Sequence, residues 1–159
     1  MKAIVLYATR YGSTRVAAER IAAALGGAEI CELNALAPAP EGYDAVIIGA
    51  PVYMGRLLKP ARAYLAAHEQ ALLRARLGLF ACGATRPGEN GFPGSVFPEA
   101  LRGHAQAICA AGGLVKPGSM RALDRFVTNM IARSGDTSGF TQVTIDDAAI
   151  ERFAKALQG

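Results

Sequence analysis

The chain has 159 residues, of which 52% are hydrophobic and 19% are charged, and its formal net charge is +4. This length and balance predict a single globular domain over residues 1–159 and exclude a disordered chain. The N-terminal residues lead straight into a patterned domain, and no apolar run approaches the roughly 20 residues that a membrane span needs. We therefore expect a cytoplasmic protein.

The cysteines and histidines offer no metal or catalytic pattern. Cys31, Cys82 and Cys109 lie far apart and form no CxxC pair, and the latter two fall in apolar runs typical of buried thiols. No cluster of His, Asp and Glu has the spacing of metal ligands. His68 and His104 lie in predicted helices beside charged residues, as surface histidines do. The sequence therefore predicts no metal site and no catalytic side chain.

The first half of the chain alternates strands with helices. Residues 2–8 are a continuous apolar run, as expected for a strand covered on both faces, and residues 13–26 show helical spacing that ends at a Gly-Gly pair. Residues 28–33 alternate in polarity and predict a more exposed strand. Residues 43–50 predict a second buried strand, and residues 57–73 predict a helix.

The second half continues in the same way. A third buried strand at 77–84 is followed by a loop at 85–95 that is rich in Gly and Pro. The pattern then predicts a helix at 97–111, a Gly-containing strand at 113–119, a helix at 122–133 and a closing helix at 146–158. This alternation is typical of an α/β fold, a three-layer sandwich in which a five-stranded parallel sheet carries helices on both faces.

Three loops leave the carboxyl ends of the predicted buried strands, at residues 9–14, 50–56 and 83–95. In open parallel sheets, ligands bind beyond these ends, at the point where the strand order reverses. We therefore expect the three loops to meet and to form one site.

The first of these loops has the composition of an anion site. It lacks the Lys of a GxxxxGK[ST] loop and the GxGxxG of a dinucleotide turn, which disfavours a nucleoside triphosphate or a pyrophosphate. A helix N-terminus presents unpaired N–H groups, Gly12 lets the backbone approach closely, and hydroxyls add donors. The alternative is that Ser13 or Thr14 only caps the helix. The composition favours a phosphate monoester, held by Thr9, Arg10, Tyr11, Gly12, Ser13 and Thr14.

The pattern Thr-x-x-Gly-x-Thr after an N-terminal strand resembles the FMN-phosphate loop of flavodoxin-like proteins, and the resemblance covers essentially the whole chain. Within this family, the chain is similar to the flavodoxin-domain group that includes the menaquinone-dependent protoporphyrinogen oxidase. Three stretches carry that likeness, namely ATRYGST at 8–14, IGAPVYMGR at 48–56 and LDRFVTNMIARSGDTSG at 123–139. The first stretch is fairly specific for FMN, and the other two indicate the group more than a reaction.

The resemblance implies FMN as the cofactor and assigns residues to it. The loop at 9–14 would hold the phosphate, and two further segments would pass the two sides of the isoalloxazine ring. Tyr53 is the best candidate to stack on that ring, because stacking needs a large planar partner and the chain has no Trp. The alternative for Tyr53 is a half-buried loop aromatic. The two segments consist of Pro51, Val52, Tyr53, Met54 and Gly55 on one side and of Gly83, Ala84, Thr85 and Arg86 on the other.

Three functional classes remain after this resemblance. The first expectation is an FMN-binding redox protein that transfers electrons or acts as an oxidoreductase. The alternative is an enzyme similar to menaquinone-dependent protoporphyrinogen IX dehydrogenase, and a flavin-free binding domain ranks last. The expected partners are a redox protein or a quinone- or porphyrin-type substrate, and no basic-aromatic module for nucleic acid is visible in the sequence.

Residues 116–133 form a basic segment, with four Lys or Arg residues against Asp124 and with apolar residues at helical spacing. A basic amphipathic helix can lie on a membrane surface or contact an anionic substrate. The alternative is an ordinary helix packed at the sheet edge. The net charge of +4 contrasts with the strongly acidic character of typical flavodoxins, so it favours acidic partners or anionic substrates. For the membrane alternative, we expect a peripheral contact with the inner face.

Overall fold

The structure is a computed structural model, and it describes residues 1–83, 85–113 and 145–159. Nearly all of the strand expected at 113–119, and the whole of the helix expected at 122–133, lie outside the described residues. The same holds for the basic segment at 116–133, for the stretch at 123–139 and for Ala84.

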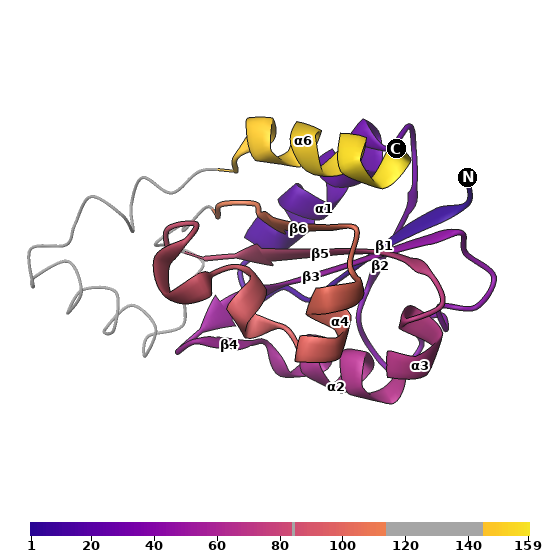
Figure 1. Ribbon diagram of the computed structural model, residues 1–159, viewed down its shortest axis with the longest axis horizontal. Coiled ribbons are helices and arrows are strands. Elements are labelled where there is room, and N and C mark those ends of the chain that lie inside the picture. Colours follow the sequence, from indigo (N-terminus) through magenta and orange to yellow (C-terminus); the bar gives the residue numbers. More distant parts are fainter. Residues whose placement is uncertain (84, 114–144) are drawn as a thin grey trace, which may run out of the picture.

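A parallel five-stranded sheet forms the centre of the fold (Figure 1). The strand order is β2-β1-β3-β5-β6, and all four neighbouring pairs run parallel. A two-residue strand, β4, pairs antiparallel with the end of β3. The strands span Ala3–Tyr7 (β1), Glu29–Glu32 (β2), Ala45–Tyr53 (β3), Arg56–Leu57 (β4), Arg76–Cys82 (β5) and Ala107–Ala110 (β6). The predicted α/β fold with a five-stranded parallel sheet is therefore confirmed.

Helices cover both faces of this sheet, which makes the predicted three layers (Figure 1). On one face lie α1 (Ser13–Ala24) and α6 (Asp147–Gln158). On the other face lie α2 (Lys59–Ala67), α3 (Glu69–Leu72) and α4 (Glu99–His104). The loop after β5 contains two single turns, η1 (Glu89–Gly91) and η2 (Gly94–Val96).

The side chains of each central strand divide between two cores because the sheet is buried on both faces. In β1, Ile4 and Leu6 pack under α2 and α3, whereas Val5 and Tyr7 pack under α1 and α6. Gly49 of β3 lies directly beside Phe80 of β5. A Cβ at position 49 would come within 2.2 Å of the Phe80 ring, so only glycine fits there.

Local signals explain the ends of the helices that were predicted well. Helix α1 ends before Gly26 and Gly27, whose φ angles of 86° and 105° are left-handed, and both N–H groups donate to carbonyls of the last turn. At the other end of the chain, Asp146 caps α6 and accepts a hydrogen bond of 3.0 Å from the N–H group of Ala149.

Two predicted elements are wrong in the middle of the chain. The helix expected at 97–111 ends at His104, and residues Ala107–Ala110 form β6 instead, the fifth strand of the parallel sheet. An Ala-rich run favours helix by propensity, but here pairing with β5 and packing against α6 override that preference. The helix expected at 57–73 is broken at His68, where φ is −115°.

Candidate functional site

The strand order reverses between β1 and β3, and the carboxyl ends of these strands meet at one edge of the sheet. The Ala8 N–H group, directly after β1, donates to the Gly49 carbonyl of β3 at 3.0 Å. Gly83, directly after β5, packs beside Val52 of β3. The first residues after β1 and β5 therefore both lie against β3, as the prediction of a shared site requires.

The N-terminus of α1 is left without a side-chain cap. Its N-cap residue is Gly12, with φ at 94°, and the Gly12 N–H group donates to Thr9 Oγ1 at 2.9 Å. The first N–H groups of any helix lack acceptors within the helix, and those of Ser13 and Thr14 have no backbone acceptor elsewhere among the described residues. These N–H groups are therefore available to a ligand. The alternative that Ser13 or Thr14 only caps this helix is wrong.

Two buried hydroxyls at this helix end lack a hydrogen-bond partner within the described part of the chain. Thr14 is fully buried, and its Oγ1 makes no hydrogen bond. The hydroxyl of Tyr11, in a half-buried residue, is likewise buried and unpartnered. Buried polar groups are normally paired, because an unmade hydrogen bond costs roughly 1–3 kcal/mol. An anion at the end of α1 would supply these two hydroxyls with the hydrogen-bond acceptors that the described part of the chain does not provide.

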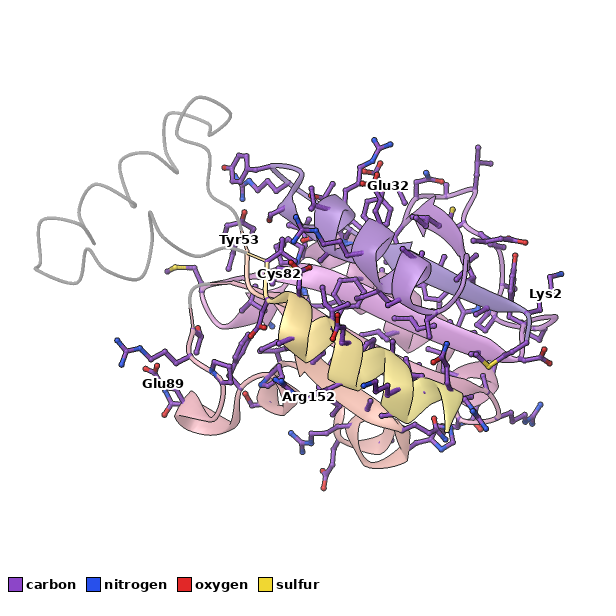
Figure 2. All side chains as sticks on the ribbon, turned by 90° about the horizontal axis from the view of Figure 1, so that it is seen from above. Lys2, Glu32, Tyr53, Cys82, Glu89 and Arg152 are labelled. Carbon is purple, nitrogen blue, oxygen red and sulfur yellow. The ribbon has the colours of Figure 1, made fainter. Side chains whose placement is uncertain are left out.

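Cys82, the last residue of β5, is buried beneath this helix end (Figure 2). Burial raises the pKa of the Cys82 thiol to about 12, against a smaller opposite effect of the neighbouring Thr14 hydroxyl. No hydrogen bond of good geometry joins the two side chains. The thiol therefore stays protonated at neutral pH and acts as a small apolar group, as predicted for Cys82 and also for Cys109.

The second expected ligand loop, at 50–56, is largely a β-hairpin. Pro51, Val52 and Tyr53 continue β3 beyond its predicted end, and Val52 and Tyr53 pair with β4. Met54 and Gly55 form the two-residue turn, with φ angles of 53° and 76°, as a type I′ hairpin requires. The side chain of Met54 is 94% exposed at the tip. The Gly in a two-residue gap between Val-Tyr and Arg-Leu was the signal for this hairpin, but Met is an unusual residue before it.

An aromatic cluster with a cation joins the first loop to this hairpin. The rings of Tyr11 and Tyr53 meet edge to face, with centroids 6.3 Å apart and planes at 82°. The Arg10 guanidinium carbon lies 5.6 Å from the Tyr11 centroid and 5.2 Å from the Tyr53 centroid. Burial raises the pKa of the Tyr53 hydroxyl, and the charge of Arg10 opposes that effect. Tyr53 lies half-buried at the carboxyl edge of the sheet (Figure 2).

The third segment follows β5 along the same edge. Gly83 is half-buried and its N–H group donates to the Gly112 carbonyl at 3.2 Å, while Thr85 and Arg86 are exposed. Ala84 lies outside the described residues, so its assignment stays a prediction. The roles assigned to these residues beside a flavin ring also stay predictions.

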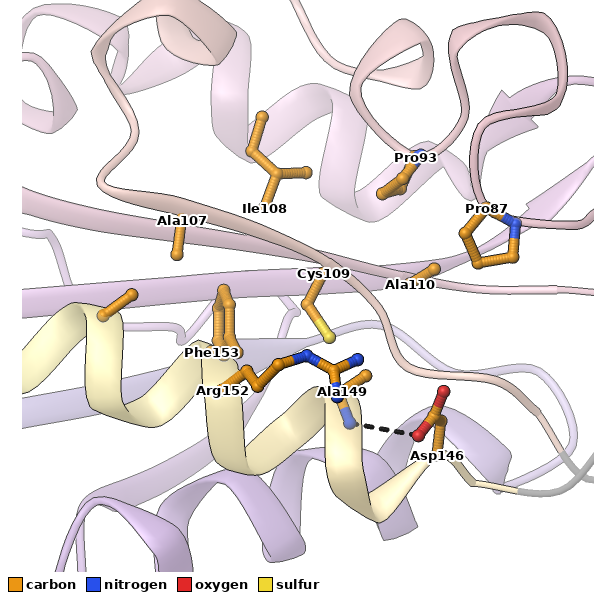
Figure 3. Close-up of a pocket in the computed structure, with 11 residues that line it drawn as sticks. Pro87, Pro93, Ala107, Ile108, Cys109, Ala110, Asp146, Ala149, Arg152 and Phe153 are labelled. Atoms are coloured by element: carbon orange, nitrogen blue, oxygen red, sulfur yellow. Dashed lines mark hydrogen bonds between the residues drawn. The ribbon is translucent and has the colours of Figure 1, made fainter.

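A separate pocket of about 350 Å³ lies between β6 and α6, away from the strand switch point (Figure 3). Cys109 lines it from β6, and Phe153 and Arg152 line it from α6 (Figure 3). Burial raises the pKa of the Cys109 thiol to about 12.

Within residues 1–83, 85–113 and 145–159, no group of three or more His, Cys, Asp or Glu residues is placed to hold a metal ion. None of the described helices is long and apolar enough to cross a membrane.

Several solved structures have the same fold. A WrbA-like flavodoxin protein from Agrobacterium tumefaciens aligns with a TM-score of 0.59 at 19% identity, over 99% of this chain and 97% of that chain. Oxidised flavodoxin 1 from Bacillus cereus aligns with a TM-score of 0.54 at 18% identity, over 99% and 93% of the two chains. A flavoprotein from Lactobacillus acidophilus, solved in complex with FMN, aligns with a TM-score of 0.51 at 18% identity, over 67% and 91%.

No curated protein matches the chain. A family model, that of the flavodoxin domain, matches residues 4–142 and thus most of the sequence. Together with the strand order and the uncapped N-terminus of α1, this match confirms the resemblance to flavodoxin-like proteins. The chain belongs to the flavodoxin domain family.

Proposed function

We propose that the protein is a flavoprotein that binds FMN and transfers electrons. The observation that carries this proposal is the buried hydroxyl of Thr14 at the uncapped end of α1, which has no hydrogen-bond partner among the described residues. Such a hydroxyl costs free energy unless a ligand supplies its acceptor. Membership of the flavodoxin domain family, and a structural neighbour solved in complex with FMN, support FMN as that ligand.

The residues at this edge of the sheet fit the two ends of FMN. For the phosphate there are the N–H groups of the first turn and the hydroxyls of Ser13 and Thr14, all neutral donors. Within the part of the chain that the structure describes, nothing lies within 4 Å of the place where a Cβ of Gly12 would be, so the backbone is open to an anion there. For the ring there is Tyr53, a half-buried aromatic residue at the same edge.

Bound FMN would supply the exchange of electrons, and the chain would supply binding, orientation and charge. The dipole of α1 favours a negative charge at its N-terminus, so the phosphate would fix the position of the cofactor. Positive side chains of Arg10, Arg56 and Arg86 belong to the three segments at this edge. Their charge favours an acidic redox partner or an anionic substrate.

Titration of the flavin-free protein with FMN, followed by quenching of flavin fluorescence, tests this proposal. We expect FMN to bind more tightly than riboflavin, because riboflavin lacks the phosphate. Ser13→Asp places a carboxylate at the N-terminus of α1, where it stabilises the helix but repels a phosphate. It should abolish FMN binding, whereas Gln70→Asp, at an exposed position of α3 outside the three loops, should bind FMN like the wild type.

Two results would contradict the proposal. If the wild type bound FMN and riboflavin equally weakly, the end of α1 would not be a phosphate site. If neither flavin bound at all, the flavin-free binding domain would be the better description.

A second candidate function is the oxidation of protoporphyrinogen with a menaquinone-type acceptor. The positive charge at the site favours it, because a substrate that carries carboxylate groups is attracted to Arg10, Arg56 and Arg86. Anaerobic mixing of the FMN-loaded protein with protoporphyrinogen and a quinone tests it. Porphyrin fluorescence that requires both the protein and the quinone would support the candidate, and fluorescence at the rate of the protein-free control would exclude it.

A further inference from the structure

Arg10 lies against two tyrosine rings at the edge of the sheet. Its guanidinium carbon is 5.2 Å from the Tyr53 centroid and 5.6 Å from the Tyr11 centroid, both within the roughly 6 Å of a cation–π contact. The two rings also contact each other edge to face. The cation therefore joins the loop after β1 to the hairpin that follows β3.

The positive charge is thus held at the tyrosine rings, and the helix end presents neutral donors. The Gly12 N–H group donates to Thr9 Oγ1, which closes a tight turn around Arg10 and leads the chain into α1. The donors at the helix end are hydroxyls and backbone N–H groups. The loop therefore separates two kinds of group, with the neutral donors at the helix and the charge beside Tyr53.

We propose that Arg10 is a positioning residue for the ring end of the FMN site, where it holds the Tyr53 ring in place and supplies a positive charge that makes bound flavin easier to reduce. This inference rests on the proposed function. Uptake of electrons increases negative charge on the ring, and a fixed cation in partly desolvated surroundings stabilises such charge. The competing interpretation is that Arg10 is a ligand of the phosphate.

Binding measurements separate these two roles. If Arg10 acts through Tyr53, Arg10→Gln weakens the binding of FMN and of riboflavin by the same factor, roughly two- to fivefold, as expected for the loss of one cation–π contact between half-buried side chains. Arg10→Lys keeps the charge and should recover most of that loss. In a Tyr53→Leu background, Arg10→Gln should have no further effect on riboflavin binding. If Arg10 is a phosphate ligand, FMN binding falls and riboflavin binding does not change, which would overturn the inference.

Potentiometry of the FMN-loaded variants gives a second readout, the midpoint potential of the bound flavin. If Arg10 had a purely structural role, its replacement would not change this potential. We expect the midpoint potential to become more negative in Arg10→Gln and to return toward the wild type in Arg10→Lys. Arg15→Gln is the matched control, because Arg15 is exposed and paired with Glu19 at 3.0 Å. Equal shifts in Arg10→Gln and Arg15→Gln, or no shift in either, would overturn the inference. Failure of the wild type to bind FMN would instead overturn the proposed function, so the two failures are distinguishable.

Discussion

Replacing Thr14 with Val should change stability and FMN binding in opposite directions. The substitution exchanges a hydroxyl for a methyl group of similar size, at a position where the side chain is fully buried. In the described part of the flavin-free protein the hydroxyl has no partner, so its removal relieves a desolvation cost of about 1–3 kcal/mol. For a chain of this size, each kcal/mol corresponds to roughly 2–4 °C in the melting temperature. Thr14→Val should therefore melt several degrees higher than the wild type when no flavin is present.

The same substitution should weaken FMN binding. A hydrogen bond from a neutral donor to a charged oxygen contributes about 1.5–3 kcal/mol, which corresponds to roughly a tenfold to hundredfold change in the dissociation constant. Riboflavin, which lacks the phosphate, should bind the variant and the wild type equally.

Two assays are enough to test this pair of effects, thermal unfolding of the flavin-free protein and fluorescence titration with FMN and riboflavin. Thr14→Ser is the matched control, because it keeps the hydroxyl. Its dissociation constant for FMN should stay within a few fold of the wild-type value. The reasoning would be refuted if Thr14→Val lowered the melting temperature of the flavin-free protein, or if it left the affinity for FMN unchanged.

The other predictions concern the hairpin tip and the two buried thiols. Met54→Asn should stabilise the protein by about 0.5–1 kcal/mol, because Asn tolerates the φ of 53° better than Met does, and urea unfolding measures this. Burial raises the pKa of Cys82 and of Cys109 from 9.0 to about 12, so the folded state keeps protons that the unfolded state loses. Stability should therefore fall as the pH rises from 9 towards 12, as urea unfolding across that range would show.

Each of these predictions has a control. Met54→Val should destabilise the hairpin, because a β-branched residue is strained at positive φ. If Met54→Val were as stable as Met54→Asn, the argument would be contradicted. In a Cys82→Ala and Cys109→Ala double variant, the fall in stability between pH 9 and 12 should become shallower. An unchanged slope would show that other groups cause it.

Strong local patterns allowed much of the fold to be predicted. The apolar run of β1, the Gly-Gly stop after α1 and the Asp146 cap of α6 are encoded within a few residues of each element. Strand β6 was missed because residues Ala107–Ala110 have helical propensity, and only their pairing with β5 makes them a strand. The hairpin was missed because Met-Gly is not one of the usual dipeptides of a two-residue turn.

The site was predictable to the same extent. The start of α1 after a loop with several hydroxyls and Gly12 could be predicted because these residues are adjacent in the sequence, and the binding of a phosphate there stays a prediction. The contact of Arg10 with Tyr53 could not, because it joins side chains from two segments that only the folded sheet brings together. The unpartnered state of Thr14 is likewise a property of packing, since no sequence pattern shows whether a buried hydroxyl finds an acceptor.

The uncapped end of α1 has a consequence for the amount of this protein in a cell. Among the described residues no side chain caps this helix, and its first turn contains no acidic residue, so its first N–H groups lack acceptors when no ligand is bound. If FMN completes it as proposed, every molecule without FMN is less stable and opens more often, and open chains are the ones that proteases degrade. The amount of this protein would then follow the supply of FMN, without any dedicated sensor.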